Sequence, residues 1–97
     1  AGEAGGVLRH VGQPVFAATS FHDNGKPSGE GLFRVAGRYE RLPIGIHKRY
    51  DEAGRLRLEL HHDERGRVAR EREYDDAGRV KRDDEVFPDG SRKAYAP

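Results

Sequence analysis

The chain has 97 residues, and its 18 Lys/Arg and 17 Asp/Glu residues leave a formal net charge of +1, so it has no global basic field that would hold nucleic acid. This length fits one domain, and the absence of cysteine excludes both a disulfide scaffold and a thiol enzyme. Hydrophobic residues make up only 34% of the chain against 36% charged residues, and no apolar run approaches the roughly 20 residues that span a membrane.

The N-terminal segment, residues 1–6, has the composition of a flexible leader, Ala-Gly-Glu-Ala-Gly-Gly. Position 1 is not methionine, so we expect a processed or trimmed start. Such a start is compatible with the bacterial cytoplasm and with export to the periplasm. We expect residues 7–97 to form a single β-repeat domain.

Strand-like segments alternate with turn signals through the rest of the chain. In the N-terminal half we expect strands over residues 7–11, 15–22, 31–35, 38–42 and 44–50. In the C-terminal half we expect strands over residues 55–62, 67–74, 79–87 and 91–95. Residues 27–29 are expected to loosen the chain, and Pro43 predicts a register break within residues 38–49.

A glycine that returns every twelve residues is the most regular feature of the sequence. The step is kept by Gly25 and Gly37, and then by Gly54, Gly66, Gly78 and Gly90. Three of these turns read Asp-x-x-Gly and begin at Asp51, Asp63 and Asp75. An aspartate there can accept hydrogen bonds from nearby backbone N–H groups, and glycine takes the left-handed conformation at little steric cost. The repeat therefore predicts an all-β fold, a single twisted antiparallel meander of repeated hairpins with no substantial helix.

The distribution of apolar residues predicts where the core lies. Leu56, Leu58 and Leu60 share one face of their strand, whereas nineteen of the thirty-three residues 61–93 are charged. Strands with that much charge cannot lie in a dry core, because unpaired buried charge is too costly. We therefore expect the better core in residues 7–60, and distal hairpins held by cross-strand charge pairs and aromatic side chains.

One phrase is specific enough to suggest a family. The segment from Tyr50 to Leu56, Tyr-Asp-Glu-Ala-Gly-Arg-Leu, returns 24 residues later as Tyr-Asp-Asp-Ala-Gly-Arg-Val from Tyr74. It resembles the MORN-like repeats of the bacterial YwqK family and, less closely, the YD repeats of Rhs shell proteins, whose arrays are far longer. The resemblance covers roughly residues 15–95, although tryptophan is absent and His62 replaces one tyrosine. It implies a sheet of hairpins and a role as an antitoxin or a small envelope protein, and the family motif contains no catalytic residue.

The residues that could carry metal or catalytic chemistry are few. His61 and His62 are adjacent, so on a strand they point to opposite faces and cannot readily bind one metal. Four-residue turns do not wrap a calcium ion, which needs six to eight oxygen ligands. No serine lies in a nucleophile elbow. We expect no cofactor, no metal and no enzymatic activity.

The Arg- and Glu-rich lattice of residues 65–85 allows two interpretations. It could be a solvated surface that keeps sheet edges from aggregating, or a recognition surface for a charged protein partner. Because arginine and tyrosine are enriched at interfaces, the predicted contact residues are Tyr50, Arg70, Arg72, Tyr74 and Arg82.

These features together predict a non-enzymatic module that binds another protein, most concretely an antitoxin or immunity-type protein that occludes a toxin. The alternative is a structural or assembly component of the bacterial envelope or of a larger complex, with self-association through sheet edges. A third hypothesis is glycan binding on Tyr39, Tyr50 and Tyr74. The sequence predicts no nucleic-acid partner and no membrane span.

Overall fold

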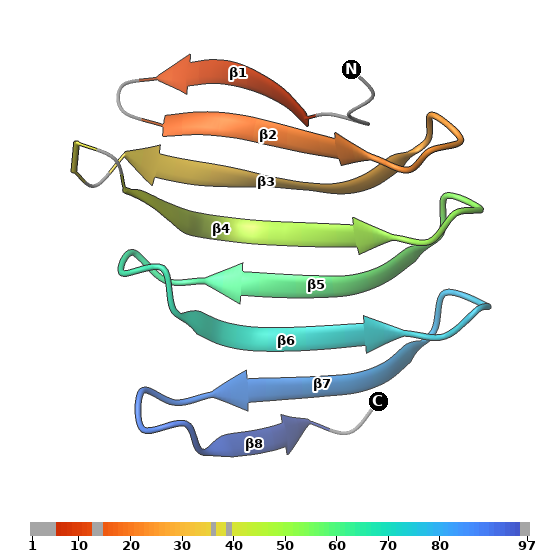
Figure 1. Cartoon of the computed structure of the whole chain (residues 1–97). Helices are drawn as coiled ribbons and strands as arrows, with labels where there is room; N and C mark the ends of the chain where they lie inside the picture. Colours follow the sequence, from red (N-terminus) through yellow and green to blue (C-terminus); the bar gives the residue numbers. More distant parts are fainter. Residues whose placement is uncertain (1–5, 13–14, 36, 39, 96–97) are drawn as a thin grey trace.

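The structure, a computed structural model, describes residues 6–12, 15–35, 37–38 and 40–95, so the leader predicted for residues 1–6 lies outside it except for Gly6. The described residues form eight strands: β1 (Gly6–Gly12), β2 (Val15–Phe21), β3 (Pro27–Val35), β4 (Arg41–Tyr50), β5 (Leu56–His62), β6 (Val68–Tyr74), β7 (Val80–Val86) and β8 (Arg92–Tyr95). Each strand pairs antiparallel with the next in the chain, in one open sheet (Figure 1). The predicted all-β meander is confirmed, and the described part contains no helix that could cross a membrane.

The glycine turns have the predicted hydrogen bonds. In the turn after β4, the N–H of Gly54 donates to the carbonyl of Asp51 at 3.0 Å, and Gly54 has a φ of 90°. The same backbone pattern recurs in the turns that contain Gly25, Gly66, Gly78 and Gly90. Gly37 instead lies in the longer connection between β3 and β4.

The turns that end at Gly25 and Gly90 are four-residue turns of the same kind. The first begins at His22 and the last at Phe87, because these residues bond to Gly25 and Gly90 as Asp51 does to Gly54. Neither has aspartate in first position. The polar side chain stands two residues later, where Asn24 accepts from the N–H of Lys26 and Asp89 accepts from that of Ser91, each at 2.9 Å.

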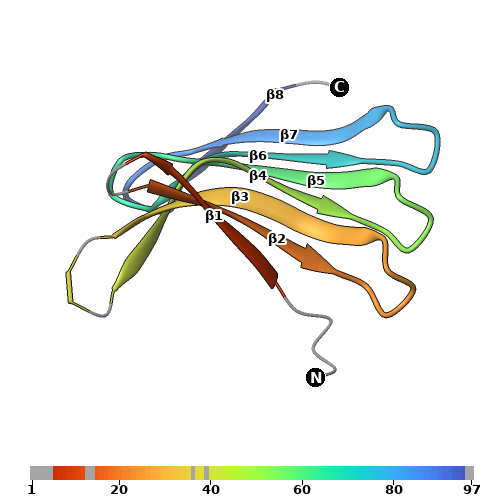
Figure 2. The same ribbon diagram turned by 90° about the horizontal axis from the view of Figure 1, so that it is seen from above.

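Next to four of these turns the strand pairing contains a β-bulge, which the sequence did not predict. The register between partner strands skips one residue in the later strand, at Ser28, Arg57, Ala69 and Lys81. Bulges of this kind increase the right-handed twist of a sheet. Figure 2, which looks along the sheet from above, shows the strands fanning out across it.

Two predictions for the N-terminal half were wrong. Residues 27–29 are not a loose segment but the start of β3, where Pro27 and Gly29 pair with β2. Residues 38–42 and 44–50 are not separate strands, because β4 runs through Pro43. The proline is tolerated there because β5 ends opposite Gly45, which leaves one side of the first part of β4 without a partner strand.

Gly45 is where β4 departs from regular pairing with β3. The register passes from Leu32↔Ile44 to Glu30↔Lys48, so β4 has two more residues than β3 over this stretch. Gly45 has a φ of 69°, a conformation that other residues adopt at a cost.

Among residues 15–35, 37–38 and 40–95 no hydrophobic side chain is buried, so the core predicted within residues 7–60 was wrong for the part of it that lies in these ranges. The sheet is a single layer, and the apolar side chains of these residues are half-buried or exposed. The buried charged side chains are instead Asp83 and Asp84, each only 8% exposed. They lie in the charge-rich segment of residues 61–93, outside the part of the chain where the sequence predicted the better core.

Candidate partner-binding surface

The register divides the side chains between two faces. We call one the tyrosine face and the other the histidine face. Alternation along each strand and direct pairing across strands give the tyrosine face Glu30, Lys48, Tyr50, Glu59, Arg70, Arg72, Tyr74 and Asp83. They give the histidine face Ala18, Gly29, Gly31, His47, Arg49, Leu58, Leu60, Glu71, Glu73, Arg82 and Asp84. Four of the five predicted contact residues therefore share the tyrosine face, and Arg82 points the other way.

On the tyrosine face, the carboxylate of Asp83 contacts both Arg70 and Arg72, the two arginines of β6 that were predicted as contact residues. The Nε and Nη2 groups of Arg70 donate to its two carboxylate oxygens, both at 2.8 Å, in a bidentate pair. Arg72 lies 3.4 Å from the same carboxylate and 3.6 Å from Glu59 on β5. The paired guanidinium of Arg70 lowers the pKa of Asp83 below its usual range. These arginines join β5, β6 and β7 in addition to any role toward a partner.

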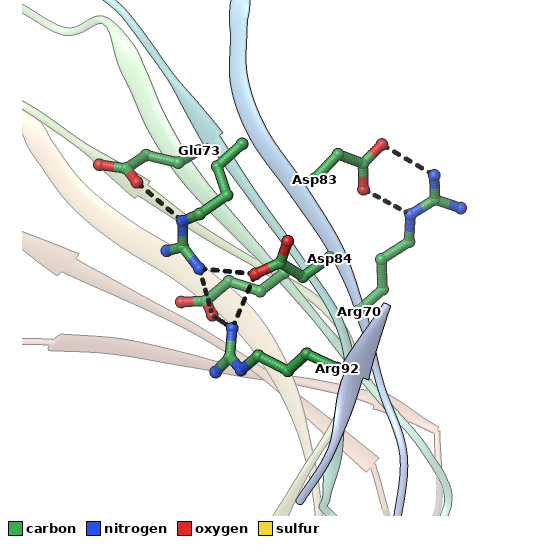
Figure 3. A network of polar contacts seen from close by, with 7 residues as sticks. Arg70, Glu73, Asp83, Asp84 and Arg92 are labelled. Atoms are coloured by element: carbon green, nitrogen blue, oxygen red, sulfur yellow. Dashed lines mark hydrogen bonds and ion pairs between the residues drawn. The ribbon is translucent and has the colours of Figure 1, made fainter. Parts of the chain in front are cut away.

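On the histidine face, Arg82 is the centre of a second network (Figure 3). Its guanidinium lies 3.2 Å from Glu71, 3.2 Å from Glu73 and 3.0 Å from Asp84. Arg92 of β8 also reaches Glu71, at 2.6 Å, and Asp84, at 3.1 Å. Hydrogen bonds from Arg92 and Arg82 lower the pKa of Glu71. This network attaches the short strand β8 to the sheet.

The two networks explain how Asp83 and Asp84 can be buried without an apolar core. An aspartate can be buried when its oxygens accept hydrogen bonds from arginine, and the arginine stems also cover it. The sequence correctly indicated cross-strand charge pairs, but the predicted arginines already have carboxylate partners within the chain.

The tyrosines of the predicted set lie nearer the turns. The hydroxyl of Tyr50 donates to Glu30 at 2.6 Å, and this hydrogen bond raises the pKa of Tyr50 to about 12. Tyr74 pairs with Val80 at the end of β6. Tyr39, the third tyrosine of the glycan hypothesis, lies outside the described residues.

The predicted turn aspartates are held by their own turns. Asp75 accepts hydrogen bonds from the backbone N–H groups of Ala77 and Arg79, each at 2.9 Å. Asp51 and Asp63 make the corresponding bonds. The backbone N–H four residues later lowers the pKa of each carboxyl, which keeps these side chains ionised and engaged as turn formers.

A hollow on the histidine face is the feature that sequence reasoning missed. It has a volume of about 220 Å³ and is lined by small residues on β2 and β3, with Phe33, His47 and Arg49 beside them. Ala18 pairs with Gly31, and Ser20 pairs with Gly29. The sequence signal was present, because small residues alternate at positions 18 and 20 and again at 29 and 31.

His47 forms one wall of the hollow. Its ring lies so close over Gly31 that a Cβ there would be 2.3 Å from Nδ1. Its Nε2 donates to the carbonyl of Leu32 at 2.7 Å, and its ring meets Phe33 and His62 edge-on at centroid distances of 4.9 and 4.6 Å. Burial lowers the pKa of His47, and the neighbouring His62 lowers it further.

Arg49, two residues after His47 on β4, also lines the hollow. It is exposed and forms no ion pair with a carboxylate of the described residues, unlike the arginines of the C-terminal networks. Residues 26–50 contain six Lys/Arg and two Asp/Glu, so this part of the sheet has a local excess of positive charge.

No family model, curated protein or solved structure matches this chain. The MORN-like resemblance therefore rests on the motif alone. Across the described residues, no three His, Cys, Asp or Glu side chains lie close enough together to hold a metal ion.

Proposed function

We propose that this protein is a non-enzymatic module that binds another protein with a face of its sheet. The observation that carries the proposal is that no hydrophobic side chain is buried among residues 15–35, 37–38 and 40–95, which include strands β2 to β8. Domains normally bury the apolar face of a sheet against a second layer. Here the half-exposed apolar side chains and the ordered polar networks are both open to a partner.

The most concrete version is an antitoxin or immunity-type protein that covers a toxin. Two features support it. The motif resembles MORN-like repeats, and charged side chains on both faces of the sheet are held in place by ion pairs before any partner arrives. A surface that is already ordered loses less entropy on binding than a flexible one.

Affinity purification from the native host tests the proposal. The full chain, tagged at one end, is purified with its bound proteins, and the captured protein is then expressed alone and titrated with purified chain. We expect a stoichiometric complex that inhibits the growth defect or the activity of the captured protein. A chain that is recovered without any stoichiometric partner, from cells grown under several conditions, would refute the proposal.

The alternative is an assembly component whose sheet is extended by its neighbours. It is supported by β8, which covers only four residues of β7 and is exposed along its whole length. Exposed edge strands are templates for pairing with another chain. Light scattering at micromolar to millimolar concentration separates the two proposals, since a monomer throughout that range contradicts self-assembly through edges.

A further inference from the structure

We propose that the partner docks on the histidine face, where the hollow beside His47 and Arg49 receives an apolar side chain that lies next to an acidic residue. The inference rests on the proposed protein-binding function and specifies the face and the chemistry of the partner. It concerns a different surface from the arginines and tyrosines of β6.

The lining of the hollow accounts for the apolar part of the recognition. Ala18, the backbone at Gly29 and Gly31, and the ring of Phe33 present mainly carbon. A volume of about 220 Å³ is the share of roughly seven water molecules, which is enough for one large side chain. Release of that water from an apolar surface favours an apolar occupant.

The charges around the hollow explain why we expect an acidic residue in the partner. Arg49, which lines the hollow, forms no ion pair with a carboxylate in the described part of the chain. Glu30 and Lys48 also border the hollow, but the carboxylate of Glu30 accepts a hydrogen bond from the hydroxyl of Tyr50 on the tyrosine face. A carboxylate of the partner would therefore meet an unpaired guanidinium.

The arginines of the two C-terminal networks are weaker candidates for binding a partner's carboxylate, because they are already paired with carboxylates of this chain. A partner carboxylate that approached Arg70 or Arg82 would have to displace Asp83, or Glu71 and Asp84, from existing ion pairs. Breaking a satisfied pair leaves a charge without its partner and offsets the new contact. Charge complementarity thus favours the hollow over the surface that composition alone suggested.

The test selects peptides from a displayed random 12-residue library on the immobilised full chain, and then measures synthetic peptides by fluorescence polarisation. We expect the enriched family to share a large apolar residue beside Asp or Glu. Replacing that acidic residue by Gln or Lys in the synthetic peptide should weaken binding progressively. Enriched peptides without an acidic residue, or the absence of any enriched family, would overturn the inference.

Variants of the chain locate the binding face. Ala18→Leu and Ser20→Leu fill the hollow and should weaken binding roughly tenfold, whereas Ala17→Leu, the neighbouring position on the other face, should not. Arg49→Gln should weaken binding roughly threefold, and Lys26→Gln, an exposed cation that does not line the hollow, is its control. Circular dichroism and urea unfolding establish that each variant is folded.

The outcomes separate this inference from the proposed function. A natural partner or an enriched peptide that binds Ala18→Leu, Ser20→Leu and Arg49→Gln as tightly as the original chain would contradict the hollow as the site. Protein binding itself would remain intact. If affinity purification yields no partner, the proposed function itself fails. Binding that is lost with Ala17→Leu and kept with Ala18→Leu would assign the partner to the tyrosine face and overturn the inference.

Discussion

Replacing Asp83 by asparagine probes the claim that ion pairs stand in for a hydrophobic core. Asp83 is 8% exposed and accepts two hydrogen bonds of 2.8 Å from Arg70. Two opposite charges about 4 Å apart attract by about 4 kcal/mol at an effective dielectric constant near 20, before desolvation is subtracted. Hydrogen bonds to charged groups contribute about 1.5–3 kcal/mol net, and a single-layer sheet lies at the low end because solvent is close on every side.

We therefore expect Asp83→Asn to lower the free energy of unfolding by about 1–2 kcal/mol. With a urea m-value of about 2 kcal/mol/M, the midpoint falls by roughly 0.5–1 M. Asp76→Asn is the matched control, since Asp76 also pairs with an arginine but its side chain is 77% exposed. Its midpoint should remain close to that of the original chain. Equal midpoints for Asp83→Asn and the original chain, or equal losses for the two variants, would refute the reasoning.

The pH dependence of the same variant gives a second test of this pair. Arg70 lowers the pKa of Asp83 in the folded protein, so the unfolded chain takes up a proton at higher pH than the folded protein does. The stabilisation is therefore fully present above the ordinary carboxyl pKa of about 3.9 and is lost as the pH falls through the lower folded value. The stability difference between Asp83→Asn and the original chain should shrink between about pH 5 and pH 2. A difference that stays constant over this range would contradict the assignment.

Three further predictions concern single contacts. Tyr50→Phe should remove from an ultraviolet titration one tyrosine whose pKa is about 12, and loss of a tyrosine with an ordinary pKa instead would contradict the hydrogen bond to Glu30. Gly78→Ala should cost about 1–2 kcal/mol in urea unfolding, because its φ is 81° and space around it is open, so a neutral effect would contradict the left-handed turn. Gly31→Ala should cost more, since the ring of His47 must move, and His47→Ala should partly rescue it; equal costs for the two glycine variants would contradict the close approach.

Much of the fold was predictable because local chemistry fixes the turns. Asp-x-x-Gly at Asp51, Asp63 and Asp75 specifies a backbone reversal with few alternatives, and evenly spaced reversals leave an antiparallel meander as the simplest fold. The complete turns at His22 and Phe87 were harder to recognise, since the polar side chain stands two residues later in each.

The division of side chains between faces was not predictable from alternation alone. A bulge shifts the register by one residue, and each shift exchanges the faces of the strands that follow. The irregularities at Arg57, Ala69 and Lys81 arise from pairing between strands rather than from any local signal. Arg82 and Arg70 were both predicted as contact residues from residue type alone, and the register places them on opposite faces.

Burial was predicted least well. The sequence indicated the better apolar core in residues 7–60 and cross-strand charge pairs in the distal hairpins, but it did not indicate that Asp83 and Asp84 would be buried. Composition counts charges without showing which are paired, and pairing decides whether a carboxylate can be buried. The hollow was missed because it needs small residues on two strands to lie side by side, which depends on the register between β2 and β3.

Scanning calorimetry of the monomeric protein tests the central claim, that this is one layer without a hydrophobic core. The heat capacity change of unfolding reports mainly the apolar surface that folding buries, and a domain of about 100 residues with an ordinary core gives about 1.2–1.5 kcal/mol/K. We predict a value below about 1 kcal/mol/K, with light scattering of the same sample confirming the monomer. A value in the ordinary range for the monomer would mean that the apolar side chains are covered in solution, and would contradict both the single-layer account and the open binding face.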